Sequence, residues 1–172
     1  MNYFELFGLP VRLKVDKAEA RRRYLELSKK NHPDFFVNED ASKQQGALET
    51  FAMLNKALKT LSSHDETIRY VLQLKGLLED EEKYQLEPSF LMEMMEVNEA
   101  LDEAGTDADP NEKVRLMQQL NNLENEIYEP VADTIENYKE GVTSEEELLQ
   151  VKDYYFKKKY LTRLRQQFGG ML

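Results

Sequence analysis

Apolar side chains recur along most of this chain at steps of three and four residues, which is the spacing of amphipathic helices. The first half has a short apolar segment at residues 3–9 and a helical pattern at residues 16–31. A longer helical pattern follows in Ala47, Phe51, Leu54, Leu58 and Leu61. One more short helix is expected at residues 68–74, before Gly76. These patterns predict an antiparallel helical hairpin with short helices beside it.

The second half has three longer amphipathic patterns, at residues 88–104, 110–138 and 144–168. Because only short turns separate them, they predict an antiparallel three-helix bundle. Pro130 lies inside the second pattern. It should kink or divide that helix, since proline lacks a backbone N–H and clashes with the preceding turn.

The acidic segment at residues 76–87 has no clear period, and we interpret it as a linker. The predicted fold is therefore all-α, with an N-terminal domain at residues 1–75 and a C-terminal helical domain at residues 88–172. One helix start in each domain has the spacing of a capping box, in which a short polar residue and a Glu three positions later bond to each other's backbone. These starts are Asp16 with Glu19, and Ser144 with Glu147.

The composition agrees with a helical protein, since glycine and proline number only seven and five. The absence of cysteine excludes disulfides, thiol chemistry and cysteine-bound zinc or clusters in this chain. With His32 and His64 as the two histidines, we expect no metal site and no cofactor. No stretch approaches the ~20 apolar residues of a membrane helix, and the N-terminus has no basic targeting segment. We expect a cytoplasmic protein that does not bind a membrane.

The charge is distributed unevenly. Residues 1–75 hold 13 Lys and Arg against 10 Asp and Glu, whereas residues 76–172 hold 10 against 23. The acidic total argues against a nucleic-acid partner, because phosphate binding requires a basic contact surface. The opposite signs of the halves suggest two differently charged protein partners, although a solvated acidic face is the commoner meaning of such a bias.

The sequence His32-Pro33-Asp34 lies between the two helices of the predicted hairpin. Proline fixes its own φ near −65° and disfavours the α conformation in the preceding residue, so the first helix should end at about Asn31. The tripeptide is then a stiff, exposed corner that offers an imidazole and a carboxylate to a partner. An ordinary helix-ending turn is the alternative interpretation.

The helix that leads into this corner is basic on its outer side. At 100° per residue, four basic side chains lie opposite or beside the apolar stripe of Ala20, Tyr24 and Leu27. They are Arg21, Arg22, Lys29 and Lys30. This basic face predicts an acidic partner surface, and plain solubility is the alternative.

The helix at residues 88–104 carries apolar residues that its core does not need. Leu91, Met92 and Met95 lie about 100° or more from the stripe that runs from Phe90 to Ala104. Three carboxylates stand beside them: Glu96, Glu99 and Glu103. Methionine adapts to varied partner shapes, and a carboxylate rim selects for basic ones. We therefore predict a protein-binding patch here.

The last helix also has two apolar stripes. One contains Leu149, Phe156, Tyr160 and Leu164, and the other contains Leu148, Val151 and Tyr155. Phe156 is a candidate to join the binding patch. The alternative, that both stripes belong to the bundle core, is equally compatible with the sequence.

No catalytic constellation is present. The chain lacks glycine-rich phosphate loops, paired metal ligands at helical spacing, and a nucleophile with a plausible base. A small hydrolase that uses His32 and Asp34 is disfavoured, because an exposed corner offers no pocket to desolvate a substrate. We expect a binding protein without enzymatic activity.

The residues resemble a known family. A short helix, a basic helix that ends in His32-Pro33-Asp34, and an apolar helix with LNKA at residues 54–57 resemble the J-domain of Hsp70 co-chaperones. The opening NYFELFGLP, the acidic linker and FLME at residues 90–93 resemble, more narrowly, the HscB type of iron-sulfur cluster biogenesis. The similarity covers essentially the whole chain. Phe35 departs from the basic residue that often follows the tripeptide, and Pro130 interrupts a helix that is usually continuous.

The resemblance implies a co-chaperone whose first domain stimulates ATP hydrolysis by an Hsp70 of the HscA type, through His32, Pro33 and Asp34 and the basic face. It implies that the second domain delivers a scaffold protein of the IscU type, bound by Leu91, Met92, Met95, Glu96, Glu99, Glu103 and Phe156. The lack of a cysteine-rich N-terminal element favours a bacterial type. Two alternatives stay open: a J-domain co-chaperone for another client, and a helical adaptor without effect on Hsp70.

Overall fold

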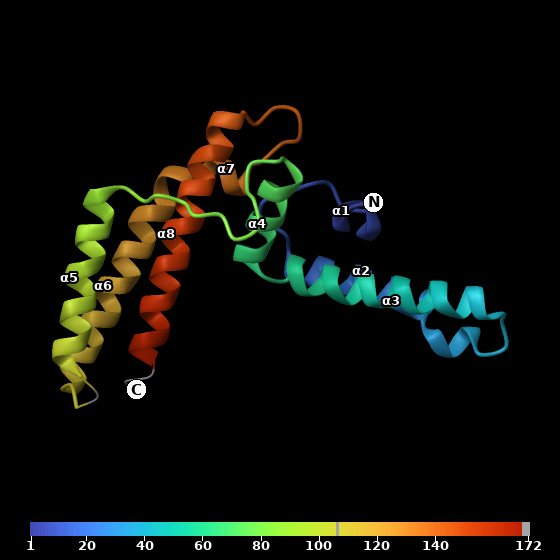
Figure 1. Ribbon diagram of the computed structural model, residues 1–172, viewed down its shortest axis with the longest axis horizontal. Coiled ribbons are helices and arrows are strands. Elements are labelled where there is room, and N and C mark those ends of the chain that lie inside the picture. The colour runs from blue at the N-terminus through green and yellow to red at the C-terminus, as the bar shows by residue number, and fades with distance from the viewer. Residues whose placement is uncertain (106, 170–172) are drawn as a thin grey trace. The chain divides into compact units, whose positions relative to one another are not determined.

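The computed structural model describes residues 1–105 and 107–169, and all the regular structure in these ranges is helical. The described residues form two compact units, Met1–Gly76 with Ile135–Val142, and residues 77–134 with 143–169, apart from residue 106. Figure 1 shows the order of the helices along the chain. The all-α prediction, with a J-domain hairpin followed by a helical domain, is confirmed.

The first unit is built on a helical hairpin of α2 (Lys17–Asn31) and α3 (Ala41–Leu61), which Figure 1 shows lying side by side. The short helix α1 (Tyr3–Phe7) packs on both of them, and α4 (His64–Leu74) packs on α3. Large apolar side chains from all these segments fill the core, including Phe4, Phe7, Leu13, Leu54, Leu61, Ile68 and Leu72.

Glycine and asparagine define the short first helix. The Asn2 side chain accepts from the Glu5 backbone N–H, and the Glu5 carboxylate accepts in return from the Asn2 N–H. Gly8 ends the helix with φ of 65°, in the left-handed region that glycine enters without strain. These two caps stabilise a helix of only five residues, which has too few internal hydrogen bonds to form alone.

The capping box predicted at Asp16 is wrong, although Asp16 is the N-cap of α2. Its carboxylate accepts from the Ala18 N–H at 2.9 Å. The Glu19 side chain does not return to the cap but forms an ion pair with Arg12 at 3.4 Å. Arg12 lies in the loop before α2, and helical spacing alone does not reveal that it pairs with Glu19. At Ser144 the predicted box is confirmed, since Glu147 and Ser144 exchange hydrogen bonds at 3.2 Å.

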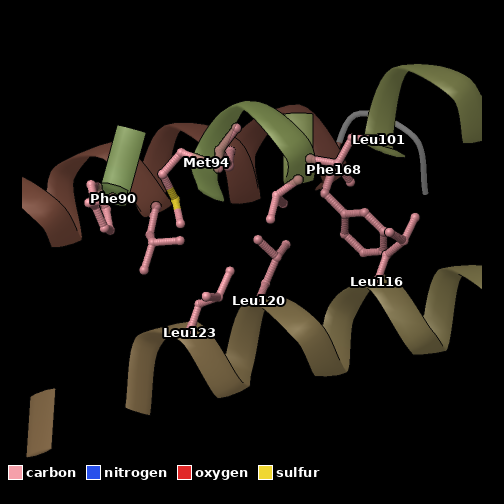
Figure 2. Packing of buried hydrophobic residues seen from close by; sticks show 10 residues of the cluster. Phe90, Met94, Leu101, Leu116, Leu120, Leu123 and Phe168 are labelled. Atoms are coloured by element: carbon pink, nitrogen blue, oxygen red, sulfur yellow. The ribbon is translucent and has the colours of Figure 1, made fainter. Parts of the chain in front are cut away.

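The second unit is a bundle of α5 (Pro88–Ala104), α6 (Pro110–Tyr128) and α8 (Glu145–Gly169). Figure 2 shows side chains from these helices meeting between the ribbons. The buried cluster contains Phe90, Met94, Val97, Leu101, Leu116, Leu120, Leu123, Leu161, Leu164 and Phe168. Most of the apolar residues predicted to face the core in α5 and α6 thus lie in this cluster.

Pro130 divides the helix that precedes α8, as the sequence predicts. α6 ends at Tyr128, a 3-10 turn η2 covers Glu129–Val131, and the short helix α7 covers Ala132–Glu136. The chain after this break joins the first unit, where Ile135 and Tyr138 are buried. Glu136 pairs there with Lys14 at 3.8 Å, and Glu140 pairs with Lys75. The predicted domain division, which gives all of residues 88–172 to the second domain, differs in this segment.

The segment between α4 and α5 has no helix but is held in place by side chains. Glu82 pairs with Lys152 at 2.7 Å, and the Tyr84 hydroxyl donates to Asp153 at 2.8 Å. The Tyr84 ring also stacks on Phe156, with ring centroids 4.5 Å apart. The segment that we interpret as a linker therefore lies along α8 within the second unit.

Candidate docking sites

The corner after α2 has the backbone geometry that its proline dictates. His32 takes φ −64° and ψ 132°, outside the helical region, and α2 ends at Asn31. Pro33 then starts a 3-10 turn, η1, that covers Pro33–Phe36. The Phe35 N–H donates to the His32 carbonyl at 3.0 Å, which closes the turn. The connection between α2 and α3 thus begins with an ordered turn, because proline at its first position needs no N–H partner.

His32 and Asp34 are held close to each other and face solvent. The Asp34 N–H donates to Nδ1 of His32 at 3.2 Å, and the Asp34 carboxylate lies 3.5 Å from the same nitrogen. The His32 ring meets the Phe51 ring edge-on, with centroids 5.3 Å apart. The accessible side-chain surface is 84% for Asp34 and 44% for His32. The carboxylate is therefore free for a partner, and the imidazole is supported from one side by α3.

The basic face of α2 is also exposed. Arg21, Arg22, Lys29 and Lys30 all point to solvent. Within residues 1–105 and 107–169, none of these four side chains forms an ion pair. Their charge is therefore available to an acidic surface, and Lys29 and Lys30 lie in the last turn of α2, directly before the corner.

The outer face of α5 has the arrangement that helical spacing predicts. Met92 and Met95 are 65% and 58% exposed, whereas Met94 between them is fully buried in the bundle. Leu91 is partly exposed. The three carboxylates predicted beside them, Glu96, Glu99 and Glu103, are exposed as well. We call these six residues the α5 face.

Phe156, the candidate to join the α5 face, is partly exposed on α8. Its ring contacts in the structure are the parallel stack on Tyr84 and an edge-on contact with Tyr155 at 5.2 Å. Its predicted stripe partners Tyr160 and Leu164 pack in the bundle core, while Leu149 is exposed. This stripe is thus partly core, and the other stripe, Leu148, Val151 and Tyr155, is fully buried.

Sequence reasoning did not select Tyr84, since this residue lies in an acidic segment without a helical period. Burial, and then the hydrogen bond to the Asp153 carboxylate, raise the pKa of Tyr84 to about 12. The phenol therefore stays protonated and donates throughout the physiological range. Together with the stack on Phe156, this bond fixes the segment that leads into α5.

Neither a metal-ligand cluster nor a membrane-spanning helix is found among the described residues. No group of three or more histidine or carboxylate side chains among them is arranged to hold a metal ion. A half-open pocket of 620 Å³ in the second unit is lined by carboxylates, apolar rings and Lys157, without a histidine. No helix among the described residues is long and apolar enough to cross a membrane.

Comparison with known sequences identifies the family. The model of the HscB C-terminal oligomerisation domain matches residues 86–168. The co-chaperone HscB homologue of Haemophilus ducreyi is 32% identical over 159 residues, which cover 91% of this chain and 90% of that protein. The chain belongs to the HscB family of co-chaperones. A Vibrio cholerae HscB homologue is 36% identical over 111 residues, which cover 64% of this chain and 65% of that protein.

Solved HscB structures have the same fold. The chaperone HscB from Vibrio cholerae matches with a TM-score of 0.77 and 27% identity, over 98% of this chain and 96% of that chain. The human co-chaperone HscB matches with a TM-score of 0.81 over 98% of this chain and 81% of that chain. Its identity of 24% supports the fold alone. The family resemblance seen in the sequence is confirmed.

Proposed function

We propose that this HscB-family chain docks its N-terminal unit on an Hsp70 chaperone of the HscA type, stimulates ATP hydrolysis there, and delivers an iron-sulfur scaffold protein of the IscU type. The observation that carries the proposal is the exposed, ordered corner of His32, Pro33 and Asp34 in a chain of this family. The J-domain would span residues 1–75, and the client-binding domain would be formed by residues 88–172 apart from the segment 135–142, which belongs to the first unit.

The chain needs no catalytic group for this function. A co-chaperone that contacts only the hydrolysis-ready state of its partner lowers the free energy of that state and so increases its population. The Asp34 carboxylate suits such a contact because it is exposed and fixed relative to α2 and α3. The unpaired cations of the basic face would steer an acidic chaperone surface toward the corner.

The α5 face is proposed to hold the scaffold protein. It combines exposed methionines with a partly exposed leucine, and carboxylates flank them. Burial of such apolar side chains supplies most binding energy in an interface, and the surrounding charges select the partner. Phe156 is included as a support, because its stack on Tyr84 fixes the chain just before α5.

Replacement of one carboxylate tests the chaperone contact. In a steady-state ATPase assay with the cognate Hsp70, we expect Asp34→Asn to reduce stimulation to near the basal rate, since the exposed charge is removed without loss of a buried contact. Glu146→Gln is the matched control, because it neutralises an exposed carboxylate in the first turn of α8, in the second unit. Full stimulation by Asp34→Asn would show that the corner is not the docking element.

Truncation of the α5 face tests the client contact. We expect Leu91→Ala and Met95→Ala each to weaken scaffold binding by about tenfold, the equivalent of ~1.4 kcal/mol for a central interface residue. Phe156→Ala should weaken scaffold binding less, because it removes the stack on Tyr84 that positions the start of α5. Isothermal calorimetry with purified scaffold measures the affinities, and Val114→Ala on α6, also an exposed apolar residue, is the control. Equal affinities for all variants would refute the assignment.

A further inference from the structure

Three apolar side chains near the corner are unusually exposed. Phe35 is 70% exposed, Val37 is 64% exposed and Leu48 is 51% exposed. Single apolar residues on a surface are ordinary, but a group of them beside a proposed docking element indicates a contact surface. An aromatic ring is notable among them, because aromatic residues are enriched in the centres of protein interfaces.

Contacts across the hairpin tip bring the three residues to one region. The Gln44 side-chain amide donates to the backbone carbonyls of Val37 at 3.2 Å and Glu39 at 2.8 Å. On α3, Leu48 follows Gln44 by four residues and precedes Phe51 by three, so it shares their side of the helix. Phe51 in turn contacts His32. Leu48 therefore lies between the two points at which α3 contacts the corner and the following loop.

The turn presents the Phe35 ring in a fixed direction. The Phe35 N–H bonds to the His32 carbonyl, and the Phe36 carbonyl accepts from the Glu39 N–H at 3.0 Å. The Phe35 ring meets the His32 ring edge-on, with centroids 6.2 Å apart. Phe36, one position later, is half-buried. The turn thus directs one phenylalanine toward the protein and the other toward solvent, which is the arrangement of an interface anchor already ordered before binding.

We propose that Phe35, with Val37 and Leu48 beside it, is an apolar anchor that inserts into an apolar pocket on the chaperone that docks at the corner. This inference rests on the proposed function and adds the chemistry of the partner's surface. Phe35 directly follows Asp34, and consecutive Cα atoms lie only about 3.8 Å apart. The Asp34 carboxylate and the Phe35 ring also both contact the His32 side chain, so a protein that binds the corner comes within reach of the Phe35 ring.

The proposal also assigns a basis for partner choice. A chaperone with a carboxylate opposite position 35 would have to desolvate that charge against the Phe35 ring without a compensating hydrogen bond. A chaperone with an apolar pocket there would bury the ring instead. The anchor thus selects an Hsp70 with an apolar pocket next to the site for the corner, while the basic face selects acidic groups farther along α2.

Binding of the full chain to its ATP-bound cognate Hsp70, measured by fluorescence anisotropy at low and high salt, tests the anchor. We expect Phe35→Ala and Phe35→Lys to raise Kd by about tenfold, as loss of a central aromatic contact does, and Phe35→Leu to raise it by no more than about threefold. The loss for Phe35→Ala should be similar at both salt concentrations, because it comes from apolar contact and leaves the charge unchanged. Val114→Ala is the control for an exposed apolar residue elsewhere.

The results distinguish failure of the anchor from failure of the proposed function. If Phe35→Ala and Phe35→Lys bind like the parent chain while Asp34→Asn fails to stimulate ATP hydrolysis, the anchor is wrong and the docking corner stands. Tighter binding by Phe35→Lys overturns the anchor as well, because it reveals an acidic pocket. If Asp34→Asn also stimulates fully, the proposed function itself is wrong.

Discussion

The corner and the α5 face position their side chains in different ways. The corner consists of consecutive residues, and its shape follows from the proline, the turn hydrogen bond and the Asp34–His32 contact, with Phe51 as support. The α5 face extends over three turns of a helix and points outward because the opposite side of α5, with Met94 and Leu101, is buried. Local backbone rules thus determine the first site, whereas tertiary packing determines the second.

The largest expected effect is a difference in stability between variants on the buried and the exposed side of α5. Met94→Ala removes a fully buried side chain from the bundle core, and we expect it to lower the free energy of unfolding by about 2–5 kcal/mol. Met95→Ala, one residue later on the exposed side, should change it by no more than about 0.5 kcal/mol. Urea unfolding of the full chain, followed by circular dichroism, measures both. Similar losses would mean that the α5 face is part of the core.

A smaller effect should distinguish charge steering from the fixed contacts of the corner. We expect the double variant Lys29→Ala/Lys30→Ala to slow association with the Hsp70 roughly threefold at low salt, because exposed charges mainly affect the association rate. The difference should shrink as salt screens the charges. The control, Lys83→Ala/Lys159→Ala, removes the same charge from exposed lysines of the second unit. A loss that persists in high salt would instead indicate a direct contact.

The smallest effect concerns the segment that leads into α5. The hydrogen bond from Lys152 lowers the pKa of Glu82 below its usual value. The folded state therefore favours the carboxylate, so this pair stabilises the fold above the unfolded-state pKa, and the contribution is lost as pH falls through the folded-state pKa. We expect Glu82→Gln to reduce the acid-induced loss in the free energy of unfolding below about pH 5. The reduction should be less than about 1 kcal/mol. Urea unfolding at several pH values checks this, and an unchanged acid dependence would contradict it.

Much of the fold could be predicted because helix signals are local. The bounds of α5 match the predicted residues 88–104, and Pro130 divides the next helix as expected. The end of α2 at Asn31 follows from Pro33. In each case neighbouring residues determine the backbone conformation, and a distant contact is not needed to select it.

The rest depended on partners that are distant in sequence. Glu19 bonds to Arg12 rather than to its own cap, and Phe156 stacks on Tyr84, 72 positions away in the chain. Ile135 and Tyr138 are buried with the first unit although the chain reaches them after α6. Helical periodicity shows that a face is apolar but not which segment covers it. For this reason the sequence could not decide whether both stripes of α8 are buried, as most of their residues are.

The central claim is that the corner and the α5 face act separately, one on the chaperone and the other on the client. Steady-state ATP hydrolysis by the cognate Hsp70, measured with and without the scaffold protein, tests it most directly. We predict that Asp34→Asn fails to stimulate under both conditions. Leu91→Ala/Met95→Ala should stimulate like the parent chain without scaffold and lose only the increment that the scaffold adds. The claim would be contradicted if the double variant lost stimulation without scaffold, or if Asp34→Asn regained it when scaffold was added.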